Sequence, residues 1–346
     1  MLTSGRTAIA TIIASIGAGS GDEVLLPAYH CRAMVEPVRW TGATPVLYRL
    51  NPDLSIDIDD LRTKISDRTR GCIIVHYFGF PQELSAILTL CREHGVPLIE
   101  DCAHAMYGDF DGLPPGAGGD YAIASMTKFF PVADGGCLVS ARHELDSPAL
   151  RAAGGRYAFK SCLNLVERAV SYDRLRPLNH LLAPLLRIKD LAWTRIKATA
   201  TQAANHSESS DALGFSPDTI GVRMSTPSRF IFRRTAAARL VSRRRNHYRF
   251  FCDAFAGLPN CRPLVRNLPA GIVPYVFPLV VDVPQTVFPI LKFDGVPMFR
   301  WEDIPDGICD VSTRYSRQLL QLCCHQDLRD SEIEWMAAAV RRAVNT

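Results

Sequence analysis

The sequence has no long apolar run. Its longest stretches fall well short of the roughly 18 residues that a membrane-spanning helix needs. It also has no C-x-x-C pair and no His/Cys cluster at zinc-ligand spacing among its 11 cysteines. We therefore expect no metal site and no disulfide framework. Cysteines in apolar runs, such as Cys72 and Cys137, are typical of small buried side chains in a reducing compartment.

Lysine and net charge are both low. The net charge is +4 over 346 residues, which argues against a nucleic-acid partner. The basic run 242–247 has no interleaved aromatic residues and is typical of a solvated helix face. Chemistry that needs a lysine amine has only six candidates, at positions 64, 128, 160, 189, 197 and 292.

Two apolar segments raise the question of export or membrane contact. Residues 7–16 follow Arg6 as a short secretory segment would, but they continue directly into a turn and a strand. An amphipathic helix and a cytoplasmic protein are the favoured interpretation. Residues 178–198 mix apolar and basic side chains. They are compatible with a membrane surface, but packing as an interdomain or dimer-contact helix is favoured.

Residues 1–150 alternate between strands and helices. Helical segments such as 32–42 and 83–95 separate short apolar runs bounded by Gly, Pro or Asp. Strands of this kind, buried on both faces, predict a mainly parallel sheet of the α/β class. The expected strands are 23–27, 44–49, 71–77, 96–101, 121–125 and 136–140.

The second half of the chain has a different pattern. Residues 151–222 lose the strand signals, and 206–211 is polar, as in a surface loop. From 223 onward the pattern is α+β, with helices expected at 233–255, 286–295 and 330–344 and a strand at 273–283. We expect a large domain over 1–222, with a helical insert over 155–222, and a small C-terminal domain over 223–346.

A carboxylate and an imidazole follow one buried strand. The strand 96–101 ends in Asp101, and His104 comes three residues later. Ligands of open α/β sheets gather at the carboxyl ends of strands, which favours a ligand contact by Asp101. An ordinary helix N-cap is the alternative.

A lysine follows the next strand. Lys128 lies in the turn after 121–125, among Met126, Phe129 and Phe130, and the sequence 134–136 is Asp-Gly-Gly. Apolar surroundings are typical of lysines that act as nucleophiles. A lysine at an exposed turn is the alternative.

The start of the chain contains a third candidate. Ser4 and Gly5 precede an expected helix, whose free N–H groups and dipole favour a phosphate. A plain N-cap explains the same residues.

In combination, these features resemble the nucleotide-sugar aminotransferases of the DegT/StrS group, a branch of the pyridoxal 5'-phosphate (PLP) enzymes of fold type I. The combination of Asp-x-x-His with a lysine followed by Asp-Gly-Gly is more specific than either half. The resemblance lies in residues 4–8, 21–48, 75–81, 99–105, 125–139 and 325–328.

The resemblance implies a role for each matching residue. Lys128 matches the lysine that carries PLP as a Schiff base and moves a proton. Asp101 matches the acid that pairs with the pyridine nitrogen, and His104 matches a residue against the phenolic oxygen. Gly5 and Arg6 match the phosphate turn. Ser125 matches a hydrogen-bonding partner of the phosphate or of the residues around it.

The sequence departs from the family in three places. Arg6 stands where the family usually has threonine, although an arginine can bind phosphate through two hydrogen bonds. Cys31 replaces the usual aromatic residue over the ring, so Tyr29 or His30 is expected to cover it. The segment 150–160, which the resemblance places at the partner subunit's site, keeps little of the family pattern.

We therefore expect a PLP-dependent aminotransferase that acts on a nucleotide-linked keto-sugar, with glutamate as the amino donor, and that forms a homodimer. One alternative is another PLP reaction, a lyase or dehydratase in cell-surface polysaccharide synthesis. Lys128 argues against the family's dehydratases, in which histidine takes its place. A second alternative is a non-catalytic regulator with the same fold, which would not need to keep Asp101, His104 and Lys128.

Overall fold

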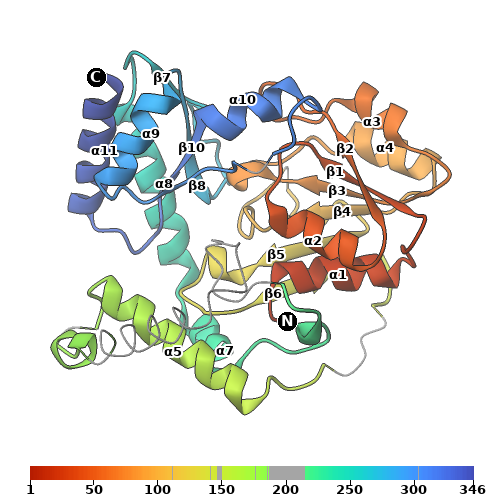
Figure 1. Ribbon diagram of the computed structural model, residues 1–346, viewed down its shortest axis with the longest axis horizontal. Coiled ribbons are helices and arrows are strands. Elements are labelled where there is room, and N and C mark those ends of the chain that lie inside the picture. The colour runs from red at the N-terminus through yellow and green to blue at the C-terminus, as the bar shows by residue number, and fades with distance from the viewer. Residues whose placement is uncertain are drawn as a thin grey trace, which may run out of the picture.

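The first part of the chain forms a six-stranded sheet (Figure 1). The strand order is β2-β1-β3-β4-β5-β6, and every neighbouring pair is parallel except β5–β6. The predicted mainly parallel α/β sheet is confirmed. The strands are β1 (Glu23–Pro27), β2 (Thr44–Tyr48), β3 (Thr69–Val75), β4 (Leu98–Asp101), β5 (Tyr121–Ser125) and β6 (Gly136–Val139).

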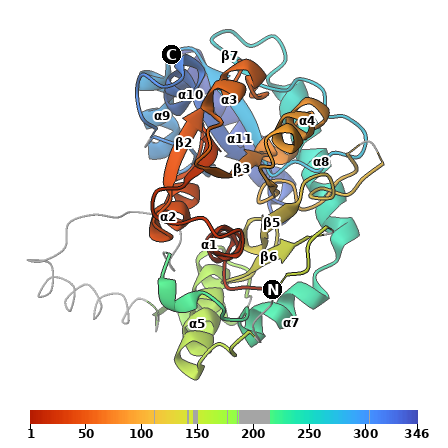
Figure 2. The same cartoon turned by 90° about the vertical axis from the view of Figure 1, so that its right-hand side faces the viewer.

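Helices cover both faces of this sheet. The connection from β1 to β2 runs in the opposite direction to those from β2 to β3 and from β3 to β4. Because parallel crossovers are right-handed, this reversal puts α2 on one face and α3 and α4 on the other. Helix α1 packs beside α2, as Figures 1 and 2 show. The helices are α1 (Gly5–Ser15), α2 (Arg32–Trp40), α3 (Ile58–Lys64) and α4 (Ser85–Glu93).

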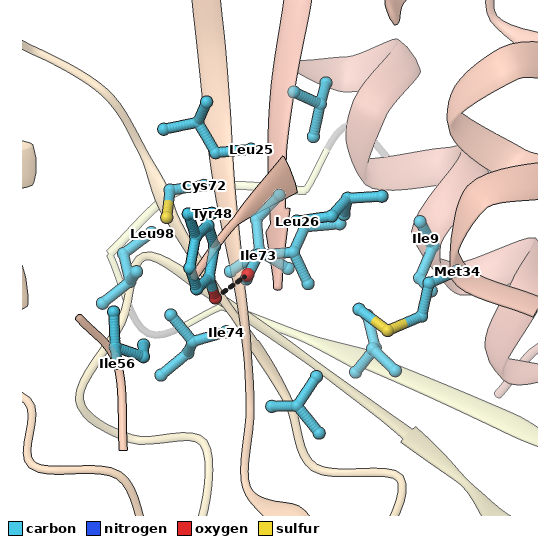
Figure 3. Close-up of a cluster of buried hydrophobic side chains, with 14 of the residues drawn as sticks. Ile9, Leu25, Leu26, Met34, Tyr48, Ile56, Cys72, Ile73, Ile74 and Leu98 are labelled. Carbon is cyan, nitrogen blue, oxygen red and sulfur yellow. Dashed lines mark hydrogen bonds between the residues drawn. The ribbon is translucent and has the colours of Figure 1, made fainter. Parts of the chain in front are cut away.

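The core lies between the sheet and its helices (Figure 3). Strand β1 is buried at every position, as expected for a strand covered on both faces. Ile9 of α1 and Met34 of α2 belong to the same cluster of buried side chains as the residues of β1. The hydroxyl of Tyr48 donates a 2.8 Å hydrogen bond to the carbonyl of Ile73, which satisfies a polar group inside an apolar region.

A second, four-stranded sheet follows, with the order β7-β8-β10-β9 and antiparallel pairing. Helices α9 and α11 pack together beside it. This matches the expected α+β character of the C-terminal part, while the domain boundary at 222/223 stays a prediction. The elements are α7 (Thr226–Arg234), α8 (Ala237–Ala254), β7 (Cys261–Pro263), β8 (Val276–Val281), α9 (Pro284–Phe293), β9 (Met298–Phe299), α10 (Asp310–Gln318), β10 (Leu319–Cys323) and α11 (Asp330–Val344).

The helix expected at 233–255 is wrong at its start. Thr235 and Ala236 have extended backbone angles, which divide the segment between α7 and α8. Helix α7 begins earlier, because Ser225 accepts a hydrogen bond from the Ser228 N–H and caps it. Propensity alone did not reveal this break, since alanine and arginine favour helix.

Helix α5 (Gly155–Ser171) packs against α7, below the six-stranded sheet in Figure 1. The computed structural model describes residues 1–110, 112–140, 142–145, 150–175, 177–184, 186, 215–302 and 304–346. The loop expected at 206–211 and most of the segment 178–198 lie outside these residues. Within them, every helix is too short or too polar to span a membrane.

Candidate active site

Asp101 ends β4 in the middle of the sheet. Its backbone lies between Val75 of β3 and Ile123 of β5, and its side chain is buried. Burial raises the pKa of this carboxyl group, while the Lys128 amine and a 2.8 Å hydrogen bond from the Ala103 N–H oppose the shift. A buried carboxylate of this kind is suited to pair with a cationic group of a ligand.

Lys128 lies where the sequence predicted it, in a turn just after β5. The turn is a single 3₁₀ turn, Met126–Lys128. The neighbouring Phe129 and Phe130 are fully buried, so the turn is fixed by its apolar side chains. The Lys128 Nζ lies 5.5 Å from the centre of the Tyr275 ring.

His104 is a buried, neutral imidazole. Burial, and then the charge of Lys128, hold the pKa of His104 well below its ordinary value. The Phe78 N–H donates to Nδ1 at 3.3 Å, so the ring proton is on Nε2. The ring stacks on Phe78 at 5.8 Å and on Tyr275 at 4.5 Å between centroids. His104 can therefore donate a hydrogen bond through Nε2.

The turn after β3 is strained. Phe78 has φ = 60°, a left-handed conformation that is costly for an aromatic residue. Gly79 also has positive φ, and a side chain there would overlap the Val273 carbonyl. The Tyr275 N–H donates to the Phe78 carbonyl at 2.8 Å. The strained turn thus directs the Phe78 N–H at His104 and joins the sheet edge to the segment before β8.

The N-terminus of α1 lies beside the end of β5. Ser4 and Thr7 form a capping box. A Cβ on Gly5 would lie 3.5 Å from the Ser125 Cβ, and a side chain on Gly136 would overlap the Ser4 carbonyl. The fold therefore brings the predicted Gly5 and Ser125 together, and the backbone N–H groups of the first helical turn favour an anion there.

Arg6 and Cys31 flank this position. Arg6 Nε lies 3.4 Å from Glu36, and its side chain is nearly buried. Burial raises the pKa of the Cys31 thiol, while Lys128 and Arg6 lower it and Asp101 raises it further. Lys128, Asp101 and Arg6 therefore all act electrostatically on Cys31. The role of Arg6 in phosphate binding stays a prediction.

Two aromatic residues of the site come from distant parts of the sequence. Trp301, just after β9, lies 4.8 Å from the Tyr29 ring and 5.6 Å from the His104 ring. Tyr275, before β8, stacks on His104. Neither belongs to a motif, so sequence reasoning missed both. The His30 ring is bonded to the Pro27 carbonyl at 2.9 Å.

The aspartate of the Asp-Gly-Gly sequence is structural. Asp134 is buried and accepts hydrogen bonds from the Ser225 N–H at 2.8 Å, the Ser225 hydroxyl at 2.6 Å and the Ser228 hydroxyl. It therefore ties the turn between β5 and β6 to the first turn of α7.

Asp134→Ala should lower the free energy of unfolding by about 3 kcal/mol, because it leaves several buried donors without an acceptor. Urea unfolding followed by circular dichroism measures this. Asp53→Ala is the control, because Asp53 is exposed and, among the described residues, its carboxylate accepts hydrogen bonds from Ser55 alone. Equal, small losses in both variants would refute the anchoring role.

His76, Glu100 and Cys102 also lie close together, with ligand atoms within 4.8 Å of one another. His76 Nε2 bonds to Glu100 at 2.8 Å, and its Nδ1 accepts from the Gln82 N–H at 3.0 Å. Burial raises the pKa of Glu100, but hydrogen bonds from His76 and the Gly119 N–H outweigh it and hold the pKa below its ordinary value. Both ring nitrogens of His76 therefore take part in hydrogen bonds within the protein, one of them to Glu100, the residue before Asp101 in β4.

Solved structures share this fold along nearly the whole chain. The aminotransferase TlmJ from Streptoalloteichus hindustanus has a TM-score of 0.68 at 23% identity, covering 99% of this chain and 85% of that one. A DegT DnrJ EryC1 StrS aminotransferase from Brucella abortus has a TM-score of 0.68 at 18% identity, covering 100% and 85%. The chain has PLP fold type I, as predicted.

Residues 1–161, just under half of the chain, match the DegT/DnrJ/EryC1/StrS aminotransferase family. Every predicted site residue lies in this segment. The cofactor of this family is PLP, and one structural neighbour, from Streptococcus pneumoniae, was solved in both PLP and PMP forms.

The curated relatives each match less than half of this chain. An L-glutamine:scyllo-inosose aminotransferase of Streptomyces griseus is 36% identical over 40% of this chain. A UDP-N-acetyl-3-dehydro-alpha-D-glucosamine 3-aminotransferase of Acidithiobacillus ferrooxidans is 34% identical over 41%. A GDP-perosamine synthase of Vibrio cholerae is 30% identical over 45%. The matches span 34%, 40% and 45% of the relatives' own lengths, respectively.

The side chains present fit PLP. The buried carboxylate of Asp101 suits a protonated pyridine nitrogen, and Nε2 of His104 is a donor for the phenolic oxygen. Gly5 brings the first turn of α1 against Ser125, so the N–H groups of that turn lie beside a serine, as a phosphate site requires. Lys128 supplies an amine that acts electrostatically on both Asp101 and His104.

Proposed function

We propose that this chain is a PLP-dependent aminotransferase that converts a nucleotide-linked keto-sugar into an amino sugar, with glutamate as the amino donor. One observation carries the proposal: Asp101, His104 and Lys128 converge at the carboxyl edge of the sheet. The names of the curated relatives, which include UDP- and GDP-sugar enzymes, support the substrate class.

Each residue has a defined task in this proposal. When bound, PLP supplies an electron sink for negative charge at the carbon that loses a proton. Asp101 keeps a proton on the pyridine nitrogen, and His104 donates to the phenolic oxygen. The first turn of α1, at Gly5, binds the phosphate together with Ser125. Lys128 binds the cofactor covalently and, once released from it, moves the proton.

An activity screen tests the substrate class. PLP-loaded protein is incubated with UDP-, GDP- and dTDP-linked keto-sugars and with scyllo-inosose, each with glutamate or glutamine as donor. We expect amination of a nucleotide-linked ketone with glutamate, and none by Lys128→Ala. Amination of scyllo-inosose alone would refute the nucleotide linkage. Release of ammonia or water from a substrate without amination would instead indicate a lyase or dehydratase.

The cytoplasm is the proposed compartment. All eleven cysteines are free thiols, including Cys162, which is exposed. Exposed thiols suit a reducing environment. A reporter fusion that is fluorescent only in the cytoplasm would test this assignment.

We further propose a two-fold homodimer in which α5 contributes to the interface. Ser161 is the one buried residue of α5, whereas Phe159 and, just beyond the helix, Tyr172 are 72% and 68% exposed. Exposed apolar surface of this kind favours an interface. Arg156 is exposed at the start of α5 and is the candidate to reach the neighbouring site. The Arg151 guanidinium bonds to two carbonyls of its own chain.

Light scattering at low micromolar concentration should give the mass of a dimer. Phe159→Glu should shift the protein toward monomer, because it places a charge in the proposed interface. Phe293→Glu, at a 92% exposed position on α9, is the matched control and should leave the dimer intact. A wild-type monomer with full activity would refute both the interface and a shared site.

A further inference from the structure

Arg244 of α8 is completely buried. Its guanidinium donates from Nε to Gln326 Oε1 at 2.7 Å and from Nη1 to the carbonyls of Tyr275 and Pro274 at 2.7 and 3.2 Å. From Nη2 it donates to the carbonyl of Lys128 at 3.0 Å. All four acceptors, one side-chain amide oxygen and three backbone carbonyls, are uncharged. A single side chain therefore connects the lysine turn with two distant segments.

Asp327 acts on Arg244 electrostatically, but among the described residues the acceptors of the Arg244 hydrogen bonds are uncharged. A buried cation of this kind is costly unless hydrogen bonds and ring contacts compensate for it. Burial lowers the pKa of Arg244, but an arginine remains charged. Its guanidinium lies 4.6 Å from the centre of the Phe129 ring, which adds a cation–π contact. The residues around Arg244 thus hold its planar, charged guanidinium group in one orientation.

Gln326, after β10, completes the arrangement. It accepts from Arg244 and donates from Nε2 to the Phe129 carbonyl at 2.8 Å. The carbonyls of Lys128 and Phe129, two consecutive residues, are therefore both held by side chains from the C-terminal part of the chain. This fixes the backbone from which the Lys128 side chain extends.

The same guanidinium fixes the surroundings of the amine. It holds the Tyr275 carbonyl, and the Tyr275 ring lies 5.5 Å from Lys128 Nζ and 4.5 Å from the His104 ring. Arg244 thus links the backbone of Lys128 to the Tyr275 ring, which lies close to both the amine and His104.

We propose that Arg244 and Gln326 form a positioning pair that sets the Lys128 amine in its working orientation toward Asp101 and His104. The inference rests on the proposed function in that Lys128 is taken as the residue that binds PLP. The pair touches neither the substrate nor the cofactor, and it acts through the backbone of the Lys128 turn and through Tyr275.

Three variants test this pair. Arg244→Lys keeps the charge but loses the planar fork, and Gln326→Leu removes the contacts to Arg244 and Phe129. Arg245→Met is the matched control: Arg245 is the next residue of α8 and bonds to the carbonyls of Pro269 and Ile272, but not to the lysine turn. Thermal unfolding of each apoprotein monitors the fold.

The first readout is the rate at which PLP is fixed to Lys128 under borohydride. A displacement of about 1 Å can cost about a hundredfold in a reaction that depends on orientation. We therefore expect a loss of about tenfold or more in Arg244→Lys and Gln326→Leu and little change in Arg245→Met.

The second readout needs no cofactor. Reductive methylation of the apoprotein with formaldehyde, and cyanoborohydride as the hydride donor, reports how freely each lysine amine reacts, with exposed Lys292 of α9 as the internal reference. In Arg244→Lys and Gln326→Leu, methylation of Lys128 relative to Lys292 should rise about threefold or more, because an amine released from its contacts reacts more freely. General unfolding would instead raise the rates of all lysines together.

The two readouts separate the two proposals. If wild-type protein does not fix PLP at Lys128, the proposed function fails, while the methylation ratio still decides whether Arg244 holds the amine. An unchanged methylation ratio in both folded variants overturns the positioning pair. A rise of the methylation ratio in Arg245→Met equal to that in the two variants also overturns the positioning pair. If Arg244→Lys does not fold, Gln326→Leu alone decides.

Discussion

Asp101→Asn should bind PLP and lose about three decades of turnover, roughly 4 kcal/mol of transition-state stabilisation. The carboxylate is buried and its one hydrogen bond among the described residues comes from the Ala103 N–H, so it remains available to a cationic ring nitrogen. An amide is neutral and does not favour the protonated ring. Turnover with the best sugar from the screen measures the loss, and bound PLP is quantified in the same preparation.

Asp120→Asn is the control for this variant. Asp120 lies at the opposite end of β5, where its carboxylate accepts a 2.8 Å hydrogen bond from the Leu98 N–H. Its removal should cost some stability but should leave turnover per bound cofactor nearly unchanged. Normal turnover in Asp101→Asn would show that Asp101 only caps the chain after β4.

Lys128→Ala should lose about four decades of turnover, or roughly 5 kcal/mol, because the amine that moves the proton is missing. A small amine such as methylamine should restore part of the rate, since it can enter the space that the lysine side chain leaves. The rescued rate should rise with the concentration of the free amine. Steady-state kinetics across a methylamine series, at constant ionic strength, measures both effects.

Lys292→Ala, at an exposed position on α9, is the matched control and should behave as wild type with and without methylamine. A Lys128→Ala variant that keeps a tenth or more of the activity would contradict the assigned role. Full loss in both lysine variants would point to damage to the fold instead.

Much of the site was predictable because it follows strand ends. Asp101 and Lys128 come directly after buried apolar runs, and parallel strands bring their carboxyl ends to one edge. The cap at Ser4 and the helix start at Gly5 are equally local features. Short-range patterns of this kind are visible in a sequence without knowledge of the tertiary structure.

The remaining site residues could not be predicted for a physical reason. Tyr275, Trp301 and Arg244 reach the site only when the C-terminal part of the chain packs against the turns that follow β3, β4 and β5. Local spacing in the sequence carries no information on that packing. Arg244 even lies in a run that is typical of a solvated helix face, yet it is fully buried among backbone carbonyls. The break at Thr235 was likewise invisible, because residues on both sides favour helix.

The covalent attachment of PLP to Lys128 is the central claim. Purified protein is loaded with PLP, reduced with borohydride, digested and analysed by peptide mass spectrometry. A pyridoxyl adduct on the peptide that contains Lys128, at a stoichiometry near one per chain, is the predicted result. An adduct on any of the other five lysines, or no adduct in protein that is folded and saturated with PLP, would contradict the account.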